Sequence, residues 1–376
     1  MNCEIKMAAP CLFGTESILA DELRRMGAAD VTAENGRVLF GGDFNILARA
    51  NICSRYAERI LITVGFFKAT SFTELFDNVK ALPWENYIGV KDAFPVNGSS
   101  LNSELHSLPD CQSIIKKAIV ERLKLKYNIS WFEETGAIYK IRFSILKDNV
   151  TVMIDTSGDG LHKRGYRRNS NDAPLKETLA ASMCDLARIY PDTKLYDPFC
   201  GSGTILIEAA MKAANIAPGL RRAFSAERFG FIPKKVWQEE RMRAQDGILH
   251  GIDFAVYGSD IDPDCVELTI ANAKKAGVEK YVNAAVSDIR DLKLPEERCL
   301  VITNPPYGER LLDIKRAEEL YGVMGKVFKP EQGKKYFVIS PHDEFEKLFG
   351  RPADKRRKLY NGMIKCQLFM YFKSSR

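Results

Sequence analysis

The sequence lacks any apolar run long enough for a membrane-spanning helix. It has 376 residues, and none of its hydrophobic stretches approaches the roughly 20 residues that cross a bilayer. Its first residues, MNCEIKMAAPCLFG, show no basic segment followed by a long apolar run, so no secretory signal is indicated. We therefore expect a cytoplasmic protein without a membrane partner.

Paired cysteines and clustered histidines are also missing. The nine cysteines stand singly, with no C-x-x-C pair, and the four histidines lie far apart in the sequence. No zinc motif and no disulfide framework is indicated, and isolated thiols are typical of a reduced cytosolic protein. We expect no metal ion in the site.

The composition is that of an ordinary globular protein with a mild basic bias. Hydrophobic residues make up 45% and charged residues 28%, and the formal net charge is +6. A chain of this length exceeds what one hydrophobic core usually organises, so two or three domains are expected. The charge permits a polyanionic partner without requiring one.

Two small α+β units are predicted in the first part of the chain. In the first unit, helical spacing of apolar residues predicts helices at residues 15–26 and 44–58, with strands at 5–7, 38–40 and 60–67. In the second unit, a helix is predicted at 110–126 and strands at 94–96, 139–146 and 149–155. The glycine-rich, basic residues 155–171 are interpreted as a linker.

Helices and strands alternate after this linker. The predicted helices are residues 176–189, 204–214 and 262–276, and the predicted strands are 194–196, 257–259, 282–286 and 300–303. Such alternation favours a parallel sheet with helices on both faces.

A glycine-containing loop, YDPFCGSGT at residues 196–204, connects a strand to an apolar helix. It allows a ligand to approach the backbone closely beside a helix N-terminus. Leu206 stands where the dinucleotide fingerprint requires its third glycine, which disfavours NAD. An acid before the glycines suits the ammonium group of S-adenosylmethionine better than a pyrophosphate, although a tight turn without a ligand is the alternative for this loop alone.

Two further acids follow predicted strands. Asp260 ends a strand in GSDID and can accept hydrogen bonds from both ribose hydroxyls of a donor nucleoside. Asp262, two residues later, is interpreted as the N-cap of the next helix. Asp288 follows the strand at 282–286 and can accept from an adenine amino group, or can simply be solvated.

The loop NPPYGER, at residues 304–310, follows a buried strand and is the predicted reaction site. An exocyclic base amine is a poor nucleophile because its lone pair is delocalised into the ring. Acceptors at the Asn304 side chain and the Pro305 carbonyl would turn that lone pair toward a methyl donor. Tyr307 offers an aromatic face for an extruded base.

These motifs, in this order and spacing, resemble class I S-adenosylmethionine-dependent methyltransferases of the Asn-Pro-Pro-Tyr branch. The stretch LHKRGYRRNSNDAPLKETLAASM and the segments NILARANICSRYAERIL and PVNGSSLNSELHSLPDCQSIIKKAIVERL resemble the THUMP-domain RNA guanine-N2 methyltransferases, in particular the bacterial 23S rRNA enzymes. The resemblance covers nearly the whole chain. It implies a ferredoxin-like domain at residues 1–65, a THUMP domain at 66–157 and a Rossmann-like class I catalytic domain with a mostly parallel sheet at 158–376.

The resemblance also implies roles for individual residues and a reaction. The cofactor is S-adenosylmethionine, and the reaction forms N2-methylguanosine in RNA, with 23S rRNA as the expected substrate. The acceptor base is held by Asn304, Pro305 and Tyr307. The donor is held by Asp197, Phe199, Gly201, Gly203 and Thr204 at its methionine end, by Asp260 at its ribose and by Asp288 at its adenine, and Ile261 is a further expected donor contact.

Three basic clusters are candidate RNA contacts, since phosphate contacts give affinity with little sequence choice. They are Lys163, Arg164, Arg167 and Arg168; Lys116, Lys117, Lys124 and Lys126; and Lys355, Arg356, Arg357 and Lys358. Any one of these clusters could instead be a solvated face.

Several alternatives stay open. Transfer RNA is the second candidate RNA, and the same loop also serves adenine, cytosine and protein glutamine methylation. A different class of function is an RNA-binding or ribosome assembly factor without activity. The modified nucleotide and the oligomeric state do not follow from the sequence.

Overall fold

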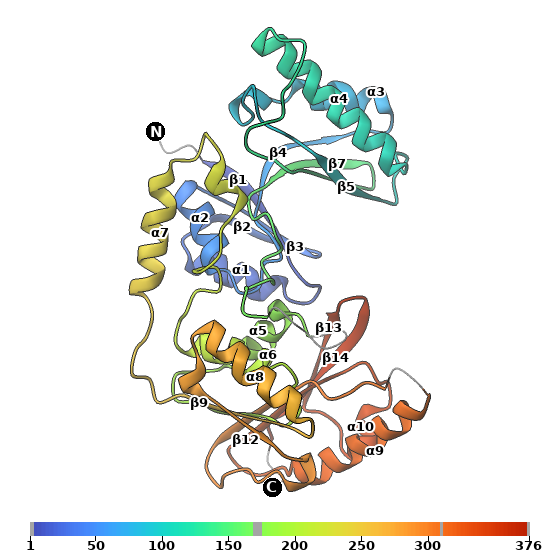
Figure 1. Cartoon of the computed structure of the whole chain (residues 1–376). Helices are drawn as coiled ribbons and strands as arrows, with labels where there is room; N and C mark the ends of the chain where they lie inside the picture. Colours follow the sequence, from blue (N-terminus) through green and yellow to red (C-terminus); the bar gives the residue numbers. More distant parts are fainter. Residues whose placement is uncertain (1–3, 168–174, 309–310, 374–376) are drawn as a thin grey trace. The chain divides into compact units, whose positions relative to one another are not determined.

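The computed structural model describes residues 4–167, 175–308 and 311–373, without the side chains of residues 311 and 312. It divides into two compact units (Figure 1). The first contains residues 1–10, 20–161 and 222–243, and the second contains 11–19, 162–221 and 244–376. None of the helices in the described part of the chain combines the length and apolar character that crossing a membrane requires.

A seven-stranded sheet in the order β2-β3-β1-β4-β7-β6-β5 forms the first unit. Its pairs are antiparallel except for β5 with β6. The strands are β1 (Ile5–Pro10), β2 (Ala29–Glu34), β3 (Arg37–Gly42), β4 (Leu61–Lys68), β5 (Val96–Leu101), β6 (Ile141–Leu146) and β7 (Asn149–Asp155). The helices are α1 (Glu16–Arg25), α2 (Phe44–Cys53), α3 (Phe72–Ala81), α4 (Leu108–Tyr127) and α7 (Lys234–Asp246), of which α1 and α7 extend past the unit's bounds.

A second seven-stranded sheet, in the order β10-β9-β8-β11-β12-β14-β13, forms the second unit. The five strands from β10 to β12 in this order run parallel to one another. β14 is antiparallel to β12, and β13 is antiparallel to β14. The strands are β8 (Lys194–Asp197), β9 (Ala255–Asp260), β10 (Val282–Val286), β11 (Cys299–Thr303), β12 (Lys334–Ser340), β13 (Lys355–Asn361) and β14 (Ile364–Tyr371). The expected Rossmann-like class I domain with a mostly parallel sheet is confirmed.

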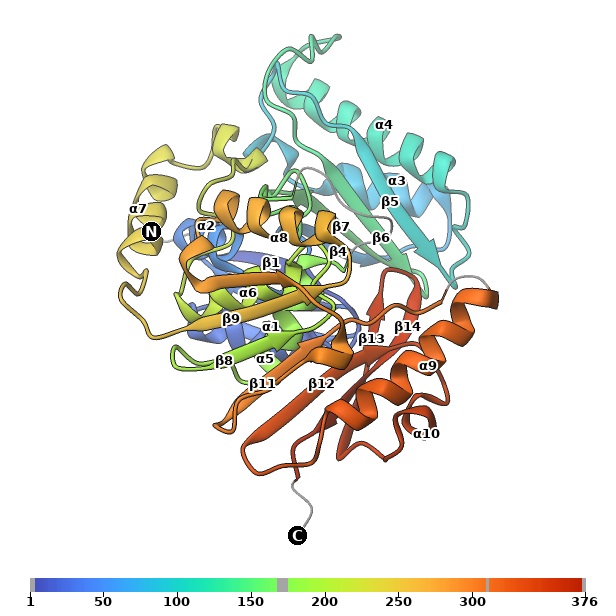
Figure 2. The ribbon, with the colours of Figure 1, turned by 60° about the horizontal axis from the view of Figure 1, so that its bottom comes forward.

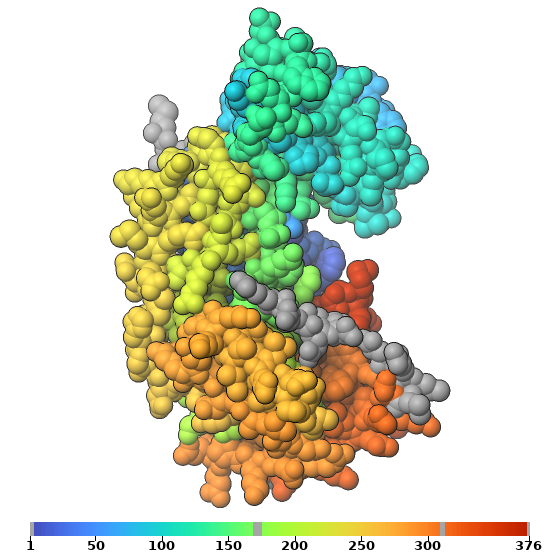
Figure 3. Space-filling model, in the orientation of Figure 1, coloured from blue at the N-terminus to red at the C-terminus, as the bar shows by residue number. Residues whose placement is uncertain are grey.

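Helices cover both faces of this sheet, as Figure 2 shows. They are α5 (Glu177–Leu186), α6 (Thr204–Ala213) and α8 (Pro263–Ala276) on one face, and α9 (Leu311–Val327) and α10 (Phe345–Phe349) on the other. The β13–β14 hairpin stands out at the surface in red in Figure 3. The strand order reverses between β8 and β11, which places the topological switch point at their carboxyl ends.

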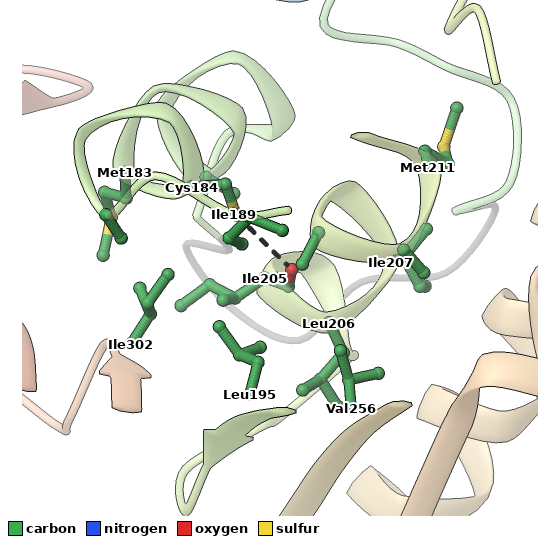
Figure 4. Packing of buried hydrophobic residues seen from close by; sticks show 14 of the residues in the cluster. Met183, Cys184, Ile189, Leu195, Ile205, Leu206, Ile207, Met211, Val256 and Ile302 are labelled. Atoms are coloured by element: carbon green, nitrogen blue, oxygen red, sulfur yellow. Dashed lines mark hydrogen bonds between the residues drawn. The ribbon is translucent and has the colours of Figure 1, made fainter. Parts of the chain in front are cut away.

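The apolar side chains of α6 explain why this helix is buried. Ile205, Leu206 and Ile207 are all buried, so apolar side chains project both toward the strands and toward α5 (Figure 4). Leu195 of β8 and Val256 of β9 pack in the same cluster. The short helix therefore has little freedom to shift, and the loop before it is held at the sheet edge.

Most predicted elements are present, and the exceptions have local physical causes. The helix expected at residues 44–58 ends at Cys53, because the buried Glu22 carboxylate accepts from Ser54 Oγ at 2.7 Å and from the Arg55 backbone N at 3.0 Å. The strand expected at 94–96 runs instead from Val96 to Leu101. The apolar pattern does not predict strand β2, because its residues are exposed or half-buried and form no apolar face.

The predicted linker is wrong for its first residues. Thr156 and Ser157 are buried in the first unit, where both bond to the Asn51 amide at 2.9 and 2.7 Å. The Thr156 backbone N donates to Ile60 O at 3.1 Å. Buried polar pairing, rather than apolar packing, holds this segment, so its composition resembles that of a linker.

A buried ion pair joins the 222–243 segment to α2 within the first unit. Arg49 donates Nε to Glu240 Oε2 at 2.8 Å and NH2 to Oε1 at 2.7 Å. The side chains are only 17% and 4% exposed, and the hydrogen bonds to Glu240 raise the pKa of Arg49. The pair is bidentate, which is the strongest geometry for an arginine and a carboxylate.

Removing one partner of this pair should destabilise the first unit strongly. We expect Arg49→Ala to lower its free energy of unfolding by about 3 kcal/mol, because the buried Glu240 carboxylate would keep only the Asn45 amide at 3.3 Å and the more distant Arg243 at 3.8 Å. Urea denaturation followed by circular dichroism measures the change. The matched control is Arg24→Ala, since Arg24 and Asp21 form an exposed pair, and its effect should stay below about 1 kcal/mol. Equal effects of the two substitutions would contradict the prediction.

Candidate active site

One cavity of about 800 Å³ in the second unit collects nearly all the predicted site residues. It lies where β8, β9, β10 and β11 end, at the switch point of the sheet. Its lining includes Asp197, Phe199, Gly201, Thr204, Asp260, Ile261, Asp288, Asn304, Pro305 and Tyr307. Gly203 is not in the lining.

The glycine loop after β8 is fixed by hydrogen bonds from neighbouring elements. Gly201 N donates to Asp260 Oδ2 at 3.0 Å, and Gly201 O accepts from Thr269 Oγ1 at 2.8 Å. Ser202 O accepts from Asn272 Nδ2 at 3.0 Å. Gly201 has φ of +50°, and no atom lies within 4 Å of the position that a Cβ would take, so a ligand can approach its backbone there.

Gly203 serves the packing of α6 against α8. Its φ is +79°, and a Cβ there would lie 2.8 Å from the Thr269 side chain. A larger residue would therefore be strained and would displace the helix whose first residue, Thr204, lines the cavity.

Asp197 is buried at the end of β8. Its Oδ1 accepts from Thr303 Oγ1 at 2.7 Å and from the Phe199 backbone N at 3.2 Å. Burial raises the pKa of Asp197 to about 7, against the opposing effect of these two hydrogen bonds. The nearby Asp260 carboxylate raises the pKa further, so Asp197 can change its charge near neutral pH.

The two remaining acids are already engaged by backbone donors. Asp260 accepts from Gly201 N and, through Oδ1, from Asp262 N at 3.1 Å, and each oxygen retains a second lone pair. Asp288 accepts from Arg290 N at 2.8 Å and forms an ion pair with the Arg290 guanidinium at 2.7 Å. Asp262 caps α8 through Asp264 N, as predicted.

An exposed apolar side chain also lines the cavity. Ile261 directly follows Asp260 and is 71% exposed, although it is a large aliphatic residue. An aliphatic face next to a carboxylate suits a ligand with a flat apolar ring attached to a sugar.

The loop after β11 forms the side of the cavity where the acceptor base is predicted to bind, here called the acceptor side. Tyr307 OH donates to Asn304 Oδ1 at 2.5 Å, so the phenol fixes the orientation of the amide. The Tyr307 ring also packs against the core, and burial raises its pKa well above the ordinary range. Pro305 is buried, which holds the backbone rigid between the two side chains.

Residues that the sequence interpretation did not single out hold this loop in place. Tyr321 of α9 donates to Pro306 O at 3.1 Å and accepts from Ser340 Oγ at 3.4 Å. Asn361 and Ile364 of the β13–β14 hairpin line the cavity. No motif marks these residues, because they reach the site only through helix packing, for Tyr321, and through the pairing of distant strands, for Asn361 and Ile364.

Arg164 and Arg167, predicted as RNA contacts, are structural instead. Arg164 is buried and its Nε lies 3.5 Å from Glu208 Oε1. Arg167 forms an ion pair with Glu177 at 3.1 Å and donates to Thr204 Oγ1 at 3.2 Å, beside the cavity. Burial with acidic partners explains the correction, and Arg168 lies outside the described residues.

The other basic clusters are partly neutralised by acids. Lys116 pairs with Glu134 at 2.6 Å, Lys124 with Glu121 at 3.5 Å, and Lys126 with Glu85 at 3.3 Å. Arg356 pairs with Glu346, and Arg357 donates to Gly14 O at 2.7 Å. The positive surface available to a polyanion is therefore smaller than the sequence suggested.

The donor set fits S-adenosylmethionine. The buried carboxylate of Asp197 suits the ammonium group, Asp260 suits the ribose hydroxyls, and Ile261 suits the adenine ring. Among the described residues, no group of three or more histidine, cysteine or acidic side chains could hold a metal ion.

Fold and site together define a class I S-adenosylmethionine-dependent methyltransferase. Three family models match the chain: the RMKL-like methyltransferase domain at residues 164–369, the RlmL ferredoxin-like domain at 6–61, and the THUMP domain at 69–155. The chain belongs to the RMKL-like methyltransferase family.

Its similarity to curated relatives extends over almost the whole sequence. It is 41% identical over 372 residues to "Putative RNA methyltransferase YpsC" of Bacillus subtilis, covering 98% of this chain and 96% of the relative. It is 35% identical over 375 residues to the ribosomal RNA large subunit methyltransferase K/L of Psychromonas ingrahamii, covering 96% of this chain. The match spans only 49% of that longer relative.

Solved structures of similar proteins share the fold. "SMU.472, a putative methyltransferase complexed with SAH" has a TM-score of 0.94 and 40% identity, with complete coverage of both chains. A structure from Listeria monocytogenes described as a "predicted N6-adenine-specific DNA methylase" has a TM-score of 0.93 and 44% identity, covering 98% of this chain and 96% of its own.

The charge of Asp197 should make donor binding depend on pH. Because its folded pKa is raised to about 7, the carboxyl is protonated below that pH and must lose its proton to bind an ammonium group. We expect the affinity for S-adenosylmethionine to rise up to about tenfold per pH unit below pH 7 and to level off above it. Isothermal titration calorimetry at several pH values measures this dependence.

The matched variant is Asp197→Asn, which keeps an oxygen that can accept from Thr303. Its affinity should be weaker than that of the wild type at pH 8 and nearly independent of pH. An equally steep pH dependence in a folded Asp197→Asn protein would assign the proton to another group.

Proposed function

We propose that the chain transfers a methyl group from S-adenosylmethionine to the N2 amine of a guanine in RNA, with 23S rRNA as its substrate. The observation that carries the proposal is that the Asn304–Tyr307 loop shares one cavity with the donor loops, in a chain that also contains a THUMP domain. The domains proposed for this function are the ferredoxin-like domain at residues 1–65, the THUMP domain at 66–157 and the catalytic domain at 158–376. The 222–243 segment of the catalytic domain packs in the first unit.

The chemistry requires an activated amine and a fixed line of approach. S-adenosylmethionine supplies an electrophilic methyl group on a sulfonium. The N2 nitrogen forms a bond to the methyl carbon while the carbon–sulfur bond breaks, and the amine then loses one proton to water. Asn304 Oδ1 and the Pro305 carbonyl would accept the two amine hydrogens and turn the lone pair away from the guanine ring.

The contact between Tyr307 and Asn304 supports this assignment. The phenol occupies one lone pair of Asn304 Oδ1 at 2.5 Å and leaves the other for an amine hydrogen. Since the amide cannot rotate without losing this bond, Asn304 is oriented before the base arrives. No carboxylate stands at this position, so the proton leaves to solvent.

The assignment to ribosomal RNA rests on the N-terminal half and on the relatives. A THUMP domain and an RlmL ferredoxin-like domain precede the catalytic domain. One relative is named for the large ribosomal subunit RNA, and another is named an RNA methyltransferase. The chain spans about half the length of the K/L protein, and guanine as the base follows from the resemblance of the motifs.

An adenine amine is the second candidate acceptor. The Listeria structure is described as an adenine-specific DNA methylase, and the Asn304–Tyr307 loop can bind either amine. The THUMP domain favours RNA over DNA.

Loss of one modified nucleoside should identify the substrate. In a strain lacking the gene, we expect 23S rRNA to lose one N2-methylguanosine, while tRNA stays unchanged. Mass spectrometry of nucleosides from separated RNAs measures this loss. Loss of N6-methyladenosine from RNA, or of N2-methylguanosine from tRNA, would replace the proposal, and an unchanged set of nucleosides would favour an assembly factor.

Substitutions in the acceptor loop should separate catalysis from donor binding. Asn304→Ala should slow methylation by about a hundredfold or more, because a preorganised acceptor for the reacting amine is lost. Tyr307→Ala should also be strongly impaired, because both the ring and the hydroxyl that orients Asn304 are lost. Tyr307→Phe keeps the ring but loses that hydroxyl, so its rate should fall between those of the wild type and Tyr307→Ala. Rates come from transfer of a radiolabelled methyl group to rRNA from the deletion strain.

Donor affinity is the internal control in this series. It should change by less than about twofold in each variant, because the donor contacts lie on the other loops. Asn283→Ala, which truncates an exposed asparagine of β10 outside the cavity lining, should methylate at the normal rate. Near-normal turnover by Asn304→Ala would contradict the amine-orienting mechanism.

A further inference from the structure

The β13–β14 hairpin ends in an exposed apolar tip beside the acceptor side of the cavity. Asn361 and Ile364 pair directly, so only Gly362 and Met363 form the turn. Gly362 has φ of +63°, the left-handed conformation that a tight two-residue turn requires. Met363 is 97% exposed, the highest value among the large hydrophobic side chains in the described part of the chain.

The two faces of the hairpin have different surroundings. Asn361 and Ile364 share one face, and both line the cavity. Tyr360 and Lys365 pair on the other face, together with Lys358 two residues earlier. The tip therefore lies between the reaction site and a basic outer face, and it stands out from the surface in Figure 3.

The lysines of this outer face differ from the arginines of the same hairpin. Lys358 and Lys365 are exposed, and neither forms an ion pair with any residue that the structure describes. The neighbouring Arg356 and Arg357, in contrast, bond within the protein. Phe13 and Tyr360 contact each other edge to face beside these lysines, which adds an aromatic surface.

Methylation of a base amine deep in a cavity requires the base to leave its stack. Extrusion exposes the faces of the neighbouring bases. Proteins that unstack base steps frequently insert an apolar side chain between the bases. The side chain must be unpacked, carried on a stiff element and close to the cavity, with positive charge beside it for the backbone. Met363 on its two-residue turn meets each of these conditions.

We propose that Met363 is a wedge that enters the base stack vacated by the target nucleotide, while Lys358 and Lys365 contact the flanking phosphates. This inference rests on the proposed function. It assigns a substrate contact to a hairpin whose inner face lines the cavity and whose outer face carries the two unpaired lysines.

The test compares structured and unstructured RNA substrates. The structured substrate is refolded rRNA from the deletion strain, and the unstructured one is a short single-stranded oligoribonucleotide containing the same target nucleotide. Met363→Ala should lower kcat/KM by about tenfold or more on the structured RNA and by less than about twofold on the single strand, where no stack must be opened. Met363→Leu should retain most of the activity on both.

A surface methionine elsewhere provides the matched control. Met242 in α7 is 66% exposed, and Met242→Ala should leave both rates unchanged. In Lys358→Gln/Lys365→Gln, binding of the structured RNA should weaken and depend less steeply on salt concentration, as expected when phosphate contacts are lost.

The outcomes separate the wedge from the proposed function. A normal rate of Met363→Ala on structured RNA, or an equal loss on both substrates, would overturn the wedge. Methylation of an adenine instead of a guanine by the wild type would overturn the proposed function, and the same comparison with that adenine would still test Met363.

Discussion

The hydrogen bond between Thr303 and Asp197 connects the two halves of the site. Thr303 ends β11 and Asp197 ends β8, and these strands are parallel neighbours at the switch point of the sheet. Both side chains are buried. Burying the Asp197 carboxyl without a hydrogen-bond partner would cost free energy, and Thr303 supplies that partner. Because Asn304 follows Thr303 directly, the loop proposed to hold the acceptor starts at a fixed distance from the loop proposed to hold the donor.

Rigid positioning of both loops is the common principle of the site. Gly201 is held by Asp260 and Thr269, and Asn304 is held by Tyr307. Tyr321 of α9 donates to the Pro306 carbonyl and so holds the backbone between Asn304 and Tyr307. A methyl transfer needs the two reacting atoms in line, and bonds from several elements restrict both sides before substrates bind.

Several charged side chains of this protein serve internal pairing. Arg49 with Glu240 and Arg167 with Glu177 are buried or nearly buried pairs that fix segments of the backbone. A count of lysines and arginines therefore overestimates the surface available to RNA. The exposed lysines at the β13–β14 hairpin are informative because they are set beside the reaction site.

Much of the fold and the donor loop could be predicted from local sequence. The helix and strand periods of the second unit, the glycine loop before α6 and the acids at strand ends are short-range features, since each depends on neighbouring residues alone. The capping box of Ser71 and Glu74 is a sequence signal for the start of α3, a helix that the periodicity of apolar residues did not predict. Strand β2 carried no such signal, because neither of its faces is apolar.

The sequence by itself determined the class of enzyme, through motifs whose backbone and side chains act locally. The tertiary structure decided which arginines are buried, that Tyr307 orients Asn304, and that Asn361 and Ile364 reach the cavity. These contacts join residues through strand pairing and side-chain packing across the second unit. Such pairing depends on the register of the whole sheet, and no local pattern of residues encodes it.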